Sequence, residues 1–108
     1  MNTDQAREQV SLAIDQTRLK EQLKQRVKLQ LVLNYAGGTF MISAELLAFL
    51  HLYKDRQQVV LPDAYTNPVL IDNIAEFTNQ CMARYEETMN EWHAEYAKIK
   101  TLRPKSEL

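Results

Sequence analysis

Two adjacent glycines, Gly37 and Gly38, are the residues whose type and spacing first suggest chemistry, because glycine-rich loops can hold a phosphate group. A phosphate loop has spaced glycines, a Lys followed by Ser or Thr, and the start of a helix that binds the anion. Here the Lys is missing, and a segment of alternating apolar residues follows. Adjacent glycines supply the positive φ angles of tight turns between antiparallel strands. We therefore predict that Gly37 and Gly38 form the turn of a β-hairpin.

Side chains that commonly catalyse reactions or bind metals are few. His51 and His93 are isolated, with no carboxylate or cysteine at metal-ligand spacing. The single Cys81 cannot form an internal disulfide and is expected to be a small buried residue. No Ser/His/Asp or Cys/His set stands out from chance. We predict a protein that is not an enzyme, with no catalytic residue, no metal site and no cofactor.

Charge is divided along the chain, although the net charge is only −1. The segment from Arg18 to Lys28 has five basic residues and one acid, whereas the segment from Asp72 to Glu95 has six acids and one base. These segments fit solvated helix faces, complementary surfaces or, for the basic one, a nucleic-acid patch. In a predicted loop, a tyrosine ring could stack on a base and an asparagine could bind a base edge. The candidate nucleic-acid residues are Arg18, Lys20, Lys24, Arg26, Lys28, Lys54, Arg56, Tyr65 and Asn67.

Length and composition indicate one domain of 108 residues, with 45% apolar and 25% charged residues. Its purely apolar runs are only a few residues long, so we expect no membrane span. The polar N-terminal residues lack the features of a signal peptide, which leads us to expect a cytoplasmic location.

The elements that must position these residues follow from periodicity. Residues 3–26 have a helix-favouring composition without Gly or Pro, and residues 73–102 repeat apolar residues at helical spacing. Between them, residues 27–72 are expected to form a β-rich core. Residues 103–108, after the second helix, are expected to form a tail. Strands are predicted for Val27 to Tyr35, Thr39 to Ser43, and the short runs "QVVLP" and "PVLI", with Pro62 and Pro68 at strand ends.

The segment from Ala44 to Tyr53 fits two structures. Its even-numbered residues continue the apolar alternation of a strand, which we favour. Helix remains the alternative, because Ser43 is a suitable N-cap and Leu46, Leu47 and Leu50 share one helical face.

The C-terminal helix would be about 40 Å long, longer than a small domain is wide. Part of its apolar and aromatic stripe should therefore find cover outside the domain core. Tyr85, Trp92 and Tyr96 are the residues that we expect to pack in a homo-oligomer or against a partner.

The order of elements from Asp4 to Asp72 resembles the Sm/LSm small β-barrel family. That resemblance implies a barrel preceded by a helix, a ring-shaped homo-oligomer and binding of single-stranded RNA. The best placement of its first motif sets Glu45 in the Asp position, but Ala48 and Phe49 follow where a bulky residue and Asn belong. The Arg-Gly pair of the second motif is replaced by residues of "YTNPVLI".

The expected fold class is thus α+β: an N-terminal helix, a small strongly bent antiparallel sheet or Sm-like open barrel, and a long amphipathic C-terminal helix. The expected function is a non-enzymatic, homo-oligomeric Sm-like module that binds RNA or single-stranded DNA. The alternative is a structural or assembly protein that acts through its long helix in protein–protein contacts. The chain also looks like small tailed-phage proteins of unknown function, in which case its location would be the host cytoplasm.

Overall fold

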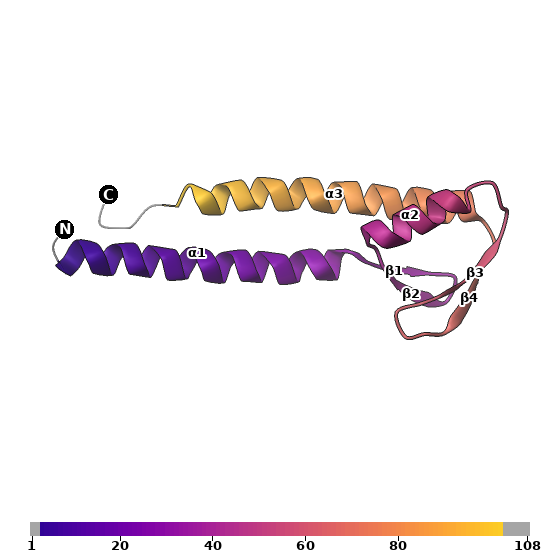
Figure 1. Ribbon diagram of the computed structural model, residues 1–108, viewed down its shortest axis with the longest axis horizontal. Coiled ribbons are helices and arrows are strands. Elements are labelled where there is room, and N and C mark those ends of the chain that lie inside the picture. The colour runs from indigo at the N-terminus through magenta and orange to yellow at the C-terminus, as the bar shows by residue number, and fades with distance from the viewer. Residues whose placement is uncertain (1–2, 103–108) are drawn as a thin grey trace.

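The computed structural model shows two long helices side by side with a small head at one end (Figure 1). It describes residues 3–102. The long helices are α1 (Thr3–Gln30) and α3 (Ile74–Lys100), and the head holds β1 (Val32–Tyr35), β2 (Gly38–Met41), α2 (Ala44–Leu52), β3 (Val59–Pro62) and β4 (Pro68–Ile71). The expected α+β class is confirmed. The expected tail, residues 103–108, lies outside the described residues.

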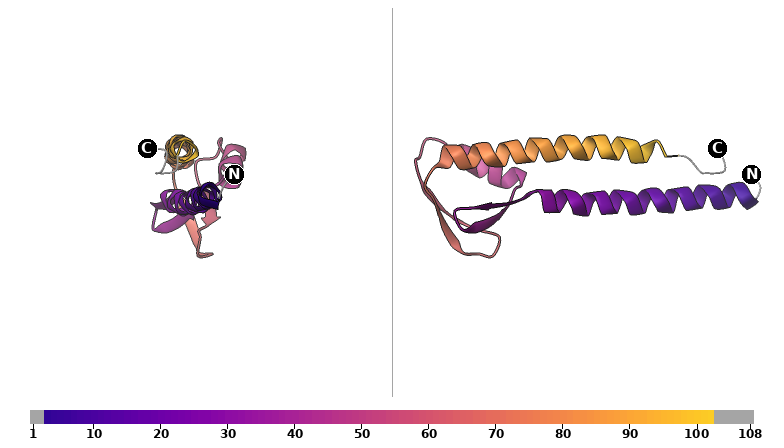
Figure 2. Two further views of the ribbon diagram at one scale, coloured as in Figure 1. Left: turned by 90° about the vertical axis from the view of Figure 1, so that its left-hand side faces the viewer. Right: turned by 180° about the vertical axis from the view of Figure 1, so that it is seen from behind.

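The molecule is strongly elongated, because both long helices leave the head in the same direction (Figure 2). Its principal extents are 66 × 23 × 18 Å, and its radius of gyration is 20.1 Å. A compact domain of this length would have a radius of gyration of about 13 Å. The two helices therefore form an arm that projects from the head.

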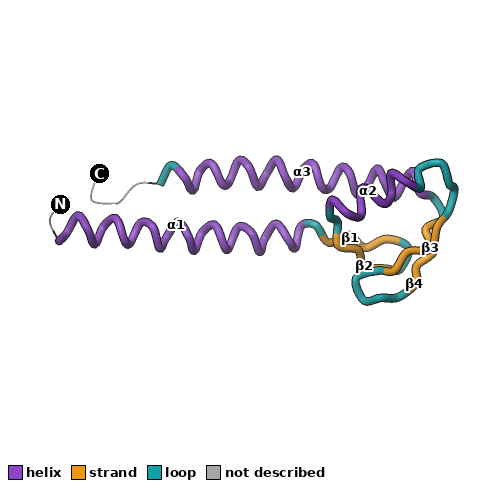
Figure 3. Tube along the Cα trace, in the orientation of Figure 1, coloured by secondary structure: helices purple, strands orange, loops and turns teal. Residues whose placement is uncertain are grey.

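Both hairpins are antiparallel, as the periodicity of their strands predicted (Figure 3). In the first, Tyr35 pairs with Gly38, and the two residues between them have positive φ angles, 52° at Ala36 and 83° at Gly37. A hairpin turn is present, as predicted, but its two central residues are Ala36 and Gly37 rather than Gly37 and Gly38. Gly37 supplies a positive φ, whereas Gly38 is the first residue of β2.

Gly38 is required by a close approach of the second hairpin. A Cβ atom at this position would lie 2.7 Å from Val69 Cγ2 and 3.1 Å from a ring carbon of Phe40. The two hairpins therefore touch at a point where only glycine fits without rearrangement.

Asp63 fastens the same two hairpins together. Its carboxylate accepts backbone N–H bonds from Tyr65 and Asn67 in its own turn, and one from Thr39 of β2 at 3.1 Å. In addition, Ala64 N donates to the Thr39 carbonyl at 2.7 Å. These donors lower the pKa of Asp63, with the Asn67 bond contributing most.

The favoured strand over Ala44 to Tyr53 is wrong, because Ala44–Leu52 is helix α2. Ser43 caps it by accepting a hydrogen bond from Leu46 N at 3.1 Å. In the helix, Leu50 is fully buried in the head core, whereas Leu52 is exposed and lies outside it.

The predicted strand start at Val27 is also too early. Helix α1 continues to Gln30, and Val27 is buried one turn after Leu23. The alternation that suggested a strand included Leu29, which is 75% exposed. Tertiary packing of Leu23 and Val27 at helical spacing overrides the two-residue period here.

The Sm/LSm resemblance is not supported by the fold. The four short strands form two separate two-stranded sheets, β1–β2 and β3–β4, within residues 3–102. No closed or open barrel is built from them, because the segment expected to supply its long bent strand is α2.

The hydrophobic core lies in the head around the first turns of α3. Asn73 caps this helix, because its side chain accepts a hydrogen bond from Glu76 N at 3.0 Å. Phe77 is fully buried, with its ring centroid 4.9 Å from that of Tyr35 and 5.0 Å from that of Phe40. Every other head element contributes to the same cluster: Leu33, Phe40, Ile42, Leu50, Leu61, Val69, Ile71, Ile74, Phe77 and Cys81.

Replacing Gly38 tests the close approach between the hairpins. We expect Gly38→Ala to lower the free energy of unfolding by about 1–3 kcal/mol, because the added methyl group overpacks against Val69. Urea denaturation measures the change. The control is Ala36→Gly, which removes the strain of a positive φ and should not destabilise the protein. Equal stability of Gly38→Ala and the wild type would contradict the close approach.

The role of Asp63 predicts a pH-dependent stability. Its folded-state pKa lies below the ordinary value of 3.8, so its contribution is present above that value and is lost as pH falls through the folded pKa. We expect Asp63→Asn to melt below the wild type at pH 7, and the gap to narrow below about pH 4. Thermal unfolding from neutral to acidic pH measures this, with the exposed Asp55→Asn as control. A gap that stays constant with pH would refute the proposed role.

Candidate functional site

The two long helices pair in antiparallel orientation to form the arm. The Gln16 side-chain amide donates to the Ile99 carbonyl at 3.4 Å, and the Lys20 ammonium lies 5.2 Å from the centroid of the Tyr96 ring. Near the head, Arg84 Nη1 donates to the carbonyls of Gln30 and Val32, at 3.1 and 3.2 Å. By this register, residues 3–13 of α1 extend beyond Lys100, the last residue of α3.

Helix α1 carries two apolar stripes on faces that are about 130° apart. Leu12, Leu19, Leu23 and Val27 form one stripe, which is partly or fully buried, and its part from Leu19 to Val27 faces α3. The other stripe, which we call the outer stripe, is exposed and consists of Ala6, Val10, Ala13, Ile14 and Thr17.

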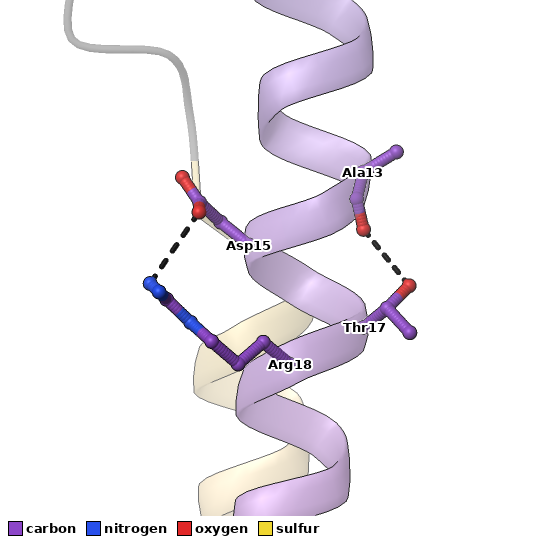
Figure 4. A network of polar contacts seen from close by, with 4 residues as sticks. All are labelled: Ala13, Asp15, Thr17 and Arg18. Carbon is purple, nitrogen blue, oxygen red and sulfur yellow. Dashed lines mark hydrogen bonds and ion pairs between the residues drawn. The ribbon is translucent and has the colours of Figure 1, made fainter.

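The outer stripe presents apolar atoms to solvent. Val10 is 59% and Ile14 62% exposed, and these two residues line shallow apolar grooves that Arg7, Asp15 and Arg18 border. The Thr17 hydroxyl donates back to the Ala13 carbonyl at 2.9 Å (Figure 4). Because the hydroxyl already donates a hydrogen bond within the helix, Thr17 does not require a polar partner in order to be covered by an apolar surface.

The aromatic residues of α3 divide between the head and the arm. Tyr85 is half-buried against the head core, as a packing role requires. Trp92 and Tyr96 remain 39% and 37% exposed. Two cations approach the Tyr96 ring, because the ammonium groups of Lys20 and Lys100 lie 5.2 and 5.6 Å from its centroid. Packing in an oligomer stays a prediction for these residues.

The candidate nucleic-acid residues lie in three separate parts of the chain. Five are on α1, where Arg18 forms an exposed ion pair with Asp15 at 3.4 Å (Figure 4). Lys54 and Arg56 are in the segment between α2 and β3, and Arg56 lies 5.2 Å from the centroid of the Tyr53 ring. Tyr65 and Asn67 are in the β3–β4 turn, with Tyr65 73% exposed.

The basic residues of α1 do not form a single patch. Lys20, Lys24 and Lys28 follow one another at steps of four and share one side of the helix. At 100° per residue, Arg18 and Arg26 point to other sides. A phosphate backbone that follows α1 would therefore meet three lysines.

Groups with distinctive chemistry are dispersed. Cys81 is fully buried, and burial raises the pKa of its thiol to about 11. His51 and His93 are exposed on α2 and α3. Among the described residues, no three His, Cys, Asp or Glu side chains gather in a way that could hold a metal ion. Within residues 3–102, no helix combines the length and apolar character needed to span a lipid bilayer.

Comparisons with protein-family models, curated proteins and solved structures give no significant match.

The sequence did not reveal two residues that matter for these surfaces. In the sequence, Arg84 is one base in an acidic segment, whereas in the structure it joins α3 to the end of α1 and the start of β1. The predicted strand "QVVLP" did not indicate which of its residues face solvent, and in the structure Val60 is 58% exposed. The uninterrupted apolar run of its strand was the available signal.

Proposed function

We propose that this protein is a non-enzymatic structural or assembly protein that self-associates through its helical arm. The exposed surface carries the proposal. The chain exposes 8033 Å², whereas a compact monomer of 12.6 kDa would expose about 6200 Å². The difference, about 1800 Å², exceeds the roughly 800 Å² per partner of a standard protein interface.

The outer stripe of α1 supplies the chemistry of the contact. Its spacing of three and four residues matches the way apolar side chains interlock between neighbouring helices. The contact that we propose is with the outer stripe of a second copy, in antiparallel orientation. This orientation brings Arg7 of one chain to the level of Asp15 of the other, so opposite charges flank the paired stripes.

Replacing the centre of the outer stripe tests this function. We expect Val10→Glu with Ile14→Lys to lower the mass of the assembly, because charges replace the apolar atoms that would be buried. The Glu and Lys are four residues apart, so they support the helix and leave the net charge unchanged. Sedimentation equilibrium at high micromolar concentration measures the mass, and circular dichroism checks the helix.

The matched control places one Glu and one Lys at other exposed positions of α1, as Gln22→Glu with Gln25→Lys, and also leaves the net charge unchanged. It should retain the wild-type mass. A wild type that sediments at the monomer mass of 12.6 kDa would contradict the proposed function.

A second candidate function, binding of RNA or single-stranded DNA, is favoured by the row of Lys20, Lys24 and Lys28. Three ammonium groups along one side of a helix can follow a phosphate backbone, although the pI of about 6.1 is low for such a protein. Only Lys20 of this row lies over a ring, that of Tyr96. Tyr65 and Asn67 would have to bind bases from the separate β3–β4 turn.

Affinity for a labelled oligouridine across a salt series tests the second candidate. Binding should weaken as salt rises, because phosphate contacts release counterions. Replacing Lys20, Lys24 and Lys28 with Gln should reduce both the affinity and its salt dependence, whereas Lys54→Gln should have a smaller effect. Absence of binding by the wild type at low salt would eliminate this candidate.

A further inference from the structure

The β3–β4 hairpin has an outer face made entirely of apolar residues. Residues directly opposite each other are Val60 and Leu70, then Pro62 and Pro68. All four are exposed, with Val60 at 58% and Leu70 at 47%. We call these four residues the ribbon face.

The ribbon face departs from the usual rule for a sheet with one solvated side. Such sheets alternate apolar residues toward the core with polar residues toward water. The inner residues of this hairpin, Leu61, Val69 and Ile71, already fill the head core. In the other hairpin, a polar pair faces outward, and the Thr39 hydroxyl donates to Asn34 Oδ1 at 2.9 Å. The ribbon face has no equivalent polar pair and is therefore a candidate contact surface.

The way a partner meets this hairpin is restricted by its prolines. Pro62 ends β3 and Pro68 begins β4, and neither has an N–H to donate to an added strand. The adjoining turn is already fastened to β2 through Asp63 and Ala64. Contact across the face is thus favoured over addition of a strand at the edge.

We propose that the ribbon face packs against the ribbon face of a second copy. A two-fold contact places the same residues on both sides, so a surface used in this way should carry no charge at its centre. The ribbon face meets that condition. By contrast, self-contact along the lysine row of α1, or along the acidic segment of α3, would bring like charges together.

Two self-contacts at opposite ends of one chain have a consequence for the assembly. The ribbon face is in the head, and the outer stripe is on the part of α1 that is farthest from it (Figure 1). If each contact has two-fold symmetry, the chains must form either a closed assembly of dihedral symmetry, of which a tetramer is the smallest, or an open linear assembly. This consequence rests on the proposed function, whereas the ribbon contact itself does not.

The test replaces Val60 with Glu and Leu70 with Lys. Because the two residues are opposite each other and outside the core, the new charges can pair across the strands and keep the hairpin folded. We expect the dissociation constant of the ribbon contact to rise roughly tenfold or more. Sedimentation equilibrium should show dimers for this variant, dimers for the outer-stripe variant, larger species for the wild type, and monomers when both changes are combined.

The matched control is Asn34→Glu with Thr39→Lys, which introduces the same pair on the outer face of the other hairpin. It should assemble like the wild type. Circular dichroism must show native helix in every variant, and Val60→Thr with Leu70→Thr serves if the charged pair fails to fold.

The outcomes separate the two proposals. A ribbon variant with the wild-type mass overturns the ribbon contact and leaves the proposed function standing. A ribbon variant of reduced mass, beside an outer-stripe variant of unchanged mass, supports the ribbon contact and refutes the contact through the arm. A monomeric wild type overturns both.

Discussion

Burial of the first turns of α3 is the constraint on which the rest of the structure depends. Ile74, Phe77 and Cys81 are almost completely inaccessible to solvent, and both hairpins and α2 pack around them. A two-stranded hairpin or a nine-residue helix is marginal by itself in water, because it buries too little apolar surface to offset its loss of conformational entropy. Each head element therefore depends on this common apolar surface. Asp63 and the close approach at Gly38 then fix how the hairpins meet.

Because the hydrophobic core is concentrated in the head, the arm has few buried residues. Leu23, Val27 and Thr88 are the buried residues of the two helices outside the head cluster among the described residues. Amphipathic helices gain most of their stability from packing of an apolar face, so the part of α1 beyond α3 is the least supported part of the arm. A second chain that covers the outer stripe would supply the missing packing. The elongated shape and the proposed self-association would thus have the same physical origin.

Charge and apolar surface are separated along this molecule, and that separation bears on function. The lysine row is in the half of α1 near the head, whereas the outer stripe is in the other half. The ribbon face lies in the head and adds an uncharged surface. Association with protein and association with a phosphate backbone would therefore use different residues, so substitutions can separate them. Such a distribution would suit the proposed assembly, because contact surfaces at both ends would allow it to grow beyond a pair.

Much of the fold could be predicted where local signals agree. The Asn73 cap and the helical spacing after it define α3, and the turn at Gly37 defines the first hairpin. The segment after Ser43 could not be assigned with certainty, because its apolar residues fit both a strand and a helix. In the fold, the segment is a helix in which Ser43 is the N-cap and Leu50 is buried in the core. Both stripes of α1 follow from the sequence once the segment is helical, since each depends only on residue spacing within one helix. Which stripe faces α3 was decided by the tertiary structure, because the head sets the angle at which two helices distant in sequence meet.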